Sequence, residues 1–112
     1  MATFEETQAK ALQFRDDRDW LQFHNPKDLA LSISLEAAEL LECFQWSGTD
    51  LEATTKQDAM AEELADIFNY CILMADVLDI DLLQTLNSKI DANAAKYPVA
   101  KAKGSAKKYT EL

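Results

Sequence analysis

The sequence predicts an all-α protein with four helices in a bundle-like arrangement, and two observations support this prediction. The chain has 112 residues but only two Gly and two Pro, so long segments contain no residue that breaks regular structure. Apolar residues make up 48% of the chain and recur in several segments at intervals of three and four, which is the spacing of one helix face. A chain of this length suits a single domain.

The first two helices have clear sequence limits. We expect the first over residues 3–19, where a modest apolar stripe recurs three or four residues apart. The second begins at Asn25, a favourable N-cap, because Pro26 after it suits the first helical position. This second helix is expected to run to about residue 44.

Two further helices and a tail complete the expected organisation. The third helix is predicted over residues 55–78, and Asp81 is expected to cap the fourth. The fourth helix ends before Pro98, because proline disfavours helical geometry in the residue preceding it. We therefore expect one domain over residues 1–98, followed by a basic tail over residues 99–112 that is mobile.

Composition narrows the classes of partner. The net charge of −9 argues against binding a nucleic-acid polymer. No apolar run is long enough to cross a membrane, and no secretory leader is recognisable. The two cysteines, Cys43 and Cys71, lie in apolar segments without metal-binding spacing, so we interpret them as reduced core residues of a cytoplasmic protein.

The charges are distributed unevenly along the chain. Thirteen acidic residues lie between Asp28 and Ser88, and Lys56 is the only base among them. The other bases lie in the flanking segments. This distribution suits a metal ion held centrally, with an anion between the metal and the flanks.

Two pairs of carboxylates lie in segments that should be buried. Glu36 and Glu39 are three residues apart in an apolar second helix, and Glu63 and Asp66 repeat that spacing in the third. Residues three apart share one helix face. Neither helix interior offers a Lys or Arg, and unpaired buried charges cost several kcal/mol each. A bound cation would balance these charges.

Magnesium fits these carboxylates best, with manganese as a possible substitute. Magnesium takes oxygen ligands and keeps sites for water and phosphate. A di-iron bundle would need Glu-x-x-His pairs, whereas the single histidine, His24, lies outside both helices. The alternative interpretation is that these acids simply face solvent on amphipathic helices.

The same residues carry a resemblance to a known family. The pattern Glu36-x-x-Glu39 followed by Glu63-x-x-Asp66 resembles the ExxE…ExxD signature of the MazG-like all-alpha NTP pyrophosphatase superfamily. The dCTP pyrophosphatase branch is the most similar, through segments spread over almost the whole chain: Arg18-Asp19-Trp20, Gln22-Phe23-His24, Phe44-Gln45-Trp46, Lys96-Tyr97-Pro98 and Lys107-Lys108-Tyr109-Thr110-Glu111-Leu112.

This resemblance implies a four-helix fold, a homodimer or homotetramer, and a magnesium-dependent attack of water on the α-phosphorus of a dNTP, with pyrophosphate leaving. It implies that the four paired carboxylates are metal ligands and that Glu36 or Glu39 also activates the water. Two positions depart from the pattern: some members carry a further glutamate where Leu35 stands, and close relatives can carry histidine at Ala11.

The remaining site candidates would bind the nucleotide. The resemblance implies that Trp20 and Trp46 flank the base, and stacking suits their chemistry; the alternative is that both are core or interface aromatics. His24 is a weaker candidate for the same pocket. The triphosphate candidates are Tyr70, one turn beyond Asp66, together with Lys89 and Asn93, which share a helix face.

Two other functions remain open from the sequence. One is an enzyme of the same architecture acting on another base, similar to phosphoribosyl-ATP pyrophosphohydrolases or dUTPases. The other is a helical interaction module without catalysis. In either case we expect self-association, because so apolar a second helix has more hydrophobic surface than one small bundle can hide.

Overall fold

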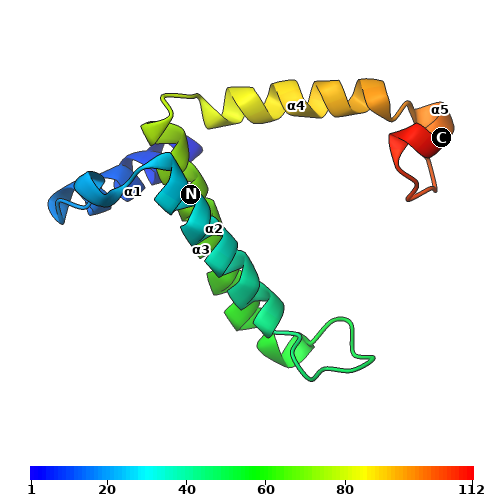
Figure 1. Ribbon diagram of the computed structural model, residues 1–112, viewed down its shortest axis with the longest axis horizontal. Helices are drawn as coiled ribbons and strands as arrows, with labels where there is room; N and C mark the ends of the chain where they lie inside the picture. Colours follow the sequence, from blue (N-terminus) through cyan, green and yellow to red (C-terminus); the bar gives the residue numbers. More distant parts are fainter. The chain divides into compact units, whose positions relative to one another are not determined.

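The computed structural model describes residues 1–112 and contains helices but no strand, which confirms the all-α prediction. Four long helices dominate (Figure 1), and short 3₁₀ segments lie in the connections before α2 and α3. In chain order the elements are α1 (Phe4–Asp17), η1 (Leu21–Phe23), α2 (Pro26–Glu42), η2 (Thr54–Lys56), α3 (Gln57–Val77), α4 (Leu82–Lys96), α5 (Val99–Ala102) and η3 (Tyr109–Glu111). None of these helices is sufficiently long and apolar to span a membrane.

The chain divides into two compact units, Met1–Asp79 and Ile80–Leu112. The first unit contains α1, α2 and α3, and the second contains α4, α5 and η3. The paired carboxylates all belong to the first unit, so its packing decides the geometry of the candidate site.

The predicted helix starts are found at capped residues. The side chain of Asn25 accepts a hydrogen bond from the backbone N–H of Asp28 at 2.9 Å, with Pro26 in the first turn as expected. Asp81 accepts from the N–H of Gln84 at 3.0 Å and begins α4. Each of these bonds satisfies an N–H that has no partner inside its helix, which fixes where the helix begins.

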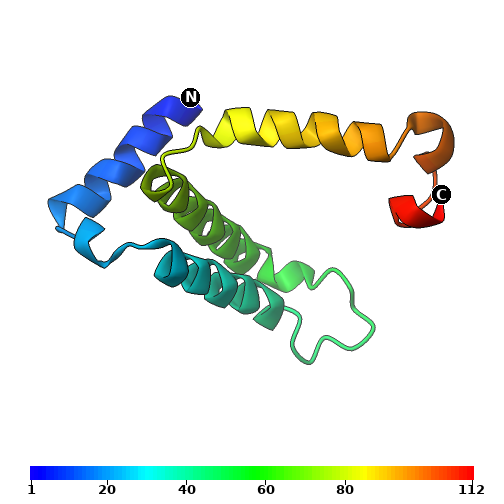
Figure 2. The ribbon, with the colours of Figure 1, turned by 45° about the horizontal axis from the view of Figure 1, so that its top comes forward.

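Helices α2 and α3 form an antiparallel hairpin and lie side by side (Figures 1 and 2). Buried or half-buried residues alternate at intervals of three and four along both helices, the spacing by which packed helices interdigitate. One such series in α2 and the residue after it is Leu29, Ile33, Glu36, Leu40 and Cys43, and one in α3 is Met60, Glu63, Ile67, Tyr70 and Met74. We call these residues the seam. One glutamate from each helix therefore occupies a position that otherwise holds an apolar or aromatic residue.

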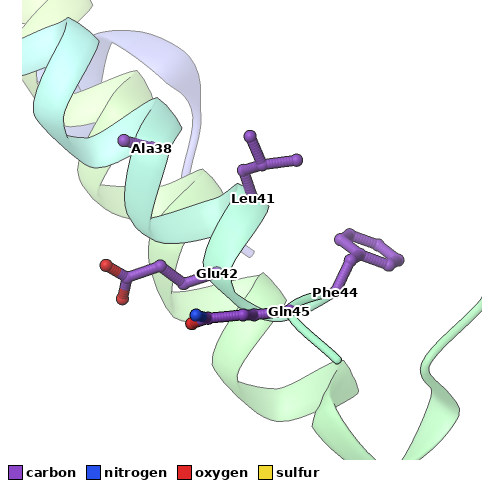
Figure 3. A pocket seen from close by; sticks show the side chains of 5 residues that line it. All are labelled: Ala38, Leu41, Glu42, Phe44 and Gln45. Atoms are coloured by element: carbon purple, nitrogen blue, oxygen red, sulfur yellow. The ribbon is translucent and has the colours of Figure 1, made fainter. Parts of the chain in front are cut away.

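Within one chain, α2 is buried on one side only, although its apolar sequence predicts a buried helix. Leu29 is the only buried residue within α2, and Leu35 on the opposite side is 65% exposed. Figure 3 shows Leu41 and Phe44 projecting from the same side at the end of α2, where a hollow of about 490 Å³ lies. The reason is that α3 covers only the seam side of α2, so the outer side has no neighbour within its unit.

The second unit contains more helix than the tail prediction described. Residues 99–112 include α5 and η3. The Tyr109 ring packs edge-on against Tyr97 at 5.8 Å between centroids, and the Lys96 ammonium lies 5.0 Å from the centre of the Tyr109 ring. The mobility of this segment stays a prediction.

Candidate metal centre and active site

Three carboxylates meet in the seam between α2 and α3. One carboxyl oxygen from each of Glu36, Glu39 and Glu63 can be chosen so that all three lie within 4.8 Å of one another. Glu36 and Glu63 are half-buried seam residues, and Glu39 is exposed at the edge of the seam. We call these three residues the acidic cluster.

The protein itself does not compensate this cluster. One oxygen atom of Glu36 and one of Glu63 are buried without a hydrogen-bond partner, although such atoms are normally paired. Loss of hydration is the main cause that raises the pKa of the Glu63 carboxyl to about 7, and the negative charges of Glu39 and Glu36 beside it add to the effect. Desolvation likewise raises the pKa of Glu36. Without a cation, the cluster therefore favours protonated carboxyls.

Asp66 lies outside the group of three. It is exposed on α3, three residues after Glu63. Its negative charge contributes to the raised pKa of Glu36, so it lies within electrostatic reach of the cluster. The structure thus brings three of the four predicted ligands together and places the fourth beside them.

The donor set fits a hard divalent cation. Every group in the cluster offers oxygen, which magnesium and manganese prefer, and no histidine or thiol belongs to it. The two unpartnered oxygens are the atoms that a cation would satisfy. The site is also open on one side, as a catalytic metal site requires, because Glu39 and Glu63 form part of the wall of a cavity of about 560 Å³.

Lys56 also lies in this cavity wall, although it was not among the site residues predicted from the sequence. It lies at the end of η2, directly before α3, and shares the wall with Glu42, Thr55 and Asp58. Its signal was present in the sequence, since it is the only base between Asp28 and Ser88.

The two tryptophans are not core residues in this chain. Trp20 is 45% exposed and meets the Phe14 ring edge-on, with 5.8 Å between centroids. Trp46 is 92% exposed and follows α2 in a left-handed backbone conformation, with φ of 66°. Both indole rings are therefore accessible to a planar ligand.

A pocket of about 270 Å³ lies between α1 and α3, near Trp20. Ala11, Phe14 and Asn69 are among the residues that line it, and Phe14 is the ring that Trp20 contacts. The small side chain at Ala11 adds to the space in this pocket. The pocket and the indole ring of Trp20 are connected through one shared aromatic residue.

The other predicted nucleotide contacts are dispersed. His24 is half-buried, its Nδ1 atom has no hydrogen-bond partner, and burial together with the charge of Arg15 lowers its pKa. Tyr70 is half-buried in the seam, one turn beyond Asp66. Lys89 and Asn93 are exposed on α4 in the second unit, whereas the acidic cluster and its cavity are built from the first unit alone.

Arg15 forms a second charged site that the sequence did not reveal. It is only 5% exposed, and its guanidinium donates to Asp16 at 2.8 Å and to Asp76 on α3 at 2.6 Å. Its carbonyl accepts the N–H of Trp20 at 3.1 Å. Arg15 therefore attaches α1, and the segment that follows it, to the end of α3.

An all-α chain with a carboxylate cluster across two antiparallel helices defines a class of metal-dependent helical proteins. Residues 31–112 match the MazG-like family. The dCTP pyrophosphatase 1 proteins of Mus musculus and Homo sapiens are each 38% identical to this chain, over 98% of its length and 68% of theirs. A pyrophosphatase from Archaeoglobus fulgidus of known crystal structure superposes with a TM-score of 0.77 at 39% identity, covering 88% of this chain and 94% of that one. The chain belongs to the MazG-like family.

Proposed function

We propose that this protein is a dNTP pyrophosphohydrolase of the cytoplasm that hydrolyses dCTP, or a related dNTP such as dATP, to the nucleoside monophosphate and pyrophosphate. The observation that carries the proposal is the acidic cluster, which has two buried oxygens without a hydrogen-bond partner and contributes Glu39 and Glu63 to the wall of a cavity large enough for a phosphate chain. The names of the relatives support the choice of nucleotide. The two free cysteines fit a reducing compartment.

The proposed metal ligands are Glu36, Glu39, Glu63 and Asp66, with magnesium as the ion and manganese as a substitute. A bound divalent ion neutralises phosphate charge and lowers the pKa of a bound water molecule. The cluster residues would hold the ion, and Glu36 or Glu39 would orient a water molecule against the α-phosphorus. Glu39 suits proton acceptance best, because it is exposed at the cavity wall while Glu36 is fixed in the seam.

Trp20 and Trp46 are proposed to contact the base. Their exposure supports this role, and the apolar pocket beside Phe14 is of a size for a single ring. His24 is proposed to lie at the edge of the base pocket, where its partnerless Nδ1 could accept a hydrogen bond. Tyr70, Lys89 and Asn93 are proposed contacts to the phosphates.

The experiment that tests the function is an assay of pyrophosphate release from each of the four dNTPs and from dUTP. We expect release from dCTP with magnesium, lower release from most of the others, and none in EDTA. We also expect magnesium to raise the melting temperature, because the ion binds the folded state only. A protein that releases no pyrophosphate from any of these nucleotides, with magnesium or manganese, would instead be a helical interaction module.

Self-association is proposed for the outer side of α2. Leu31, Leu35 and Leu41 are each more than half exposed there, and a second copy of the chain would remove them from water. We expect sedimentation equilibrium at micromolar concentration to give a dimer or a tetramer. Leu35→Glu should shift the protein towards monomer and lower activity, and a fully active wild-type monomer would refute the proposal.

A further inference from the structure

Lys56 is the one positive charge in the wall of the cavity beside the acidic cluster. The same wall contains four carboxylates, those of Glu39, Glu42, Asp58 and Glu63. A lysine among so many acids would ordinarily form a salt bridge. Both salt bridges of the protein, however, belong to Arg15, so the ammonium group of Lys56 has no carboxylate oxygen within 4.0 Å. It is free to bind a ligand.

Lys56 lies directly before α3, ahead of Glu63 in the chain, and lines the same cavity as Glu63. It precedes Glu63 by seven residues, which corresponds to two helical turns and about 10 Å along the axis. The wall of the cavity therefore contains two carboxylates of the acidic cluster, those of Glu39 and Glu63, and the ammonium group of Lys56.

A triphosphate with its α-phosphorus beside the acidic cluster would have its β- and γ-phosphates further along the cavity, within which Lys56 lies. Lysine binds phosphate as a compact point charge. We propose that Lys56 binds the β- and γ-phosphates, and that it stabilises the pyrophosphate as it leaves. This inference rests on the proposed function, and it adds a phosphate contact from η2 that the sequence motifs do not include.

The chemical step defines what Lys56 would do. The water oxygen forms a bond to the α-phosphorus, and the bond from the α-phosphorus to the oxygen that bridges to the β-phosphorus breaks. The electron pair of that bond stays on pyrophosphate, and the proton of the water passes to a cluster carboxylate. Negative charge increases on the bridging oxygen as the bond breaks, and a nearby ammonium group opposes this increase in charge.

A purely structural role for Lys56 makes a different prediction. If Lys56 only offsets repulsion among the cavity carboxylates, its neutralisation should lower stability and leave pyrophosphate binding unchanged. If it binds phosphate, its neutralisation should weaken pyrophosphate binding. Metal affinity without nucleotide should then stay the same or rise, because a positive charge has been removed from the neighbourhood of the cation site.

The test compares Lys56→Gln and Lys56→Arg with Lys27→Gln, an exposed lysine in the first turn of α2. Three quantities are measured on each protein: calorimetric binding of magnesium alone, inhibition by pyrophosphate and by the nucleoside monophosphate, and steady-state kinetics with dCTP. Melting temperatures check the fold.

We expect Lys56→Gln to weaken pyrophosphate inhibition and to lower kcat/KM about 10- to 100-fold, the range of a hydrogen bond to a charged group. Inhibition by the monophosphate and magnesium binding should not weaken. Lys56→Arg should retain most of the affinity for pyrophosphate, and Lys27→Gln should match the wild type. Unchanged pyrophosphate inhibition in Lys56→Gln, with normal wild-type turnover, would overturn this role alone. A wild-type protein with no turnover would instead overturn the proposed function, and this inference with it.

Discussion

Glu63 and Asp76 lie on the same helix, and each meets a charged residue from another helix, but only one of the two sites is electrically balanced. At the end of α3, Asp76 accepts a 2.6 Å hydrogen bond from the nearly buried guanidinium of Arg15. In the seam, Glu63 meets Glu36 and Glu39, and no base is within reach. We call these two places the Arg15 site and the acidic cluster.

The difference shows that this fold can provide a counter-charge where a buried charge needs one, since the buried guanidinium of Arg15 has two carboxylate partners. The lack of a counter-charge in the acidic cluster is therefore a property of that site. An uncompensated group inside a protein lowers stability, so the cluster is costly for the metal-free protein. A site that lowers the stability of the protein until a cation binds is typical of a functional site. The Arg15 site, in contrast, holds two helices together.

Neutralising the acidic cluster should have the largest effect on activity and no cost in stability. We expect Glu63→Gln, and similarly Asp66→Asn, to lower kcat/KM by at least about 100-fold, because loss of even an outer metal contact costs 10- to 100-fold. The free energy of unfolding without metal should stay equal or rise, since repulsion is relieved. Urea denaturation in EDTA and pyrophosphate release measure the two effects.

Glu62→Gln is the matched control, because it removes the adjacent carboxylate, which is exposed and outside the cluster. It should keep the wild-type rate. Wild-type turnover by Glu63→Gln at saturating magnesium would remove Glu63 from the set of ligands.

Breaking the Arg15 site should mainly lower stability, whereas neutralising the acidic cluster mainly lowers activity. Arg15→Met removes the hydrogen bonds to Asp16 and Asp76 and leaves Asp76 unpaired. Because the Asp76 side chain is 37% exposed, we expect a loss of about 2 kcal/mol, less than for a fully buried pair. Arg18→Met is the control, since Arg18 is exposed and stacks on Phe14; its loss should stay below about 1 kcal/mol. Equal losses in the two variants would contradict the special role of Arg15.

Trp20 is attached to the Arg15 site through its backbone, yet its side chain is proposed to act on the nucleotide. Trp20→Ala should raise KM for dCTP about 10- to 100-fold, the value of stacking one base on an aromatic ring, with kcat little changed. Leu21→Ala, in the 3₁₀ segment that directly follows Trp20, should leave KM unchanged. A large loss of stability with an unchanged KM would make Trp20 a packing residue.

The smallest effect is a difference in pH dependence between the two regions, measured by urea denaturation without metal. Folding raises the pKa of Glu63 to about 7, so the folded protein holds more protons than the unfolded one between pH 4.5 and 7, and stability falls as pH rises through that range. Folding lowers the pKa of His24, so its contribution to stability is lost as pH falls below 6.5.

Two variants separate these contributions. Relative to wild type, Glu63→Gln should gain stability as pH increases from 5 to 8, and His24→Asn should gain stability as pH decreases. Magnesium should abolish the first trend, because the bound ion holds the carboxylates deprotonated. Parallel pH curves for all three proteins would refute both assignments.

Local signals were sufficient for the helices and for the choice of carboxylates. Asn25 and Asp81 were identifiable as caps because capping depends on neighbours within three residues. The Glu36 and Glu63 pairs were identifiable because a charge without a base stands out in an apolar segment. The sequence did not predict that Glu36 lies in the seam and Glu39 at its edge. This difference depends on the register in which α2 and α3 pack, and no local sequence pattern contains that register.

Features that depend on distant residues could not be predicted. The partner of Arg15 is 61 residues away, and the sequence does not indicate which of many acids it meets. The hydrophobicity of α2 indicated more apolar surface than one bundle can hide, but it did not indicate which side α3 covers, because composition does not record the position of neighbouring helices. Lys56 could have been selected from the sequence alone, as a lone base directly before a helix that contains two predicted ligands.

The backbone of Trp46 has an evolutionary consequence. A left-handed conformation costs a residue with a side chain roughly 1–2 kcal/mol relative to glycine, and at this position the side chain is also a large indole in water. Selection for stability alone would favour glycine at such a turn. At this one position, therefore, stability is lower than it could be and nucleotide binding is favoured. Trp46→Gly should give a protein that melts at a higher temperature and binds nucleotide less well.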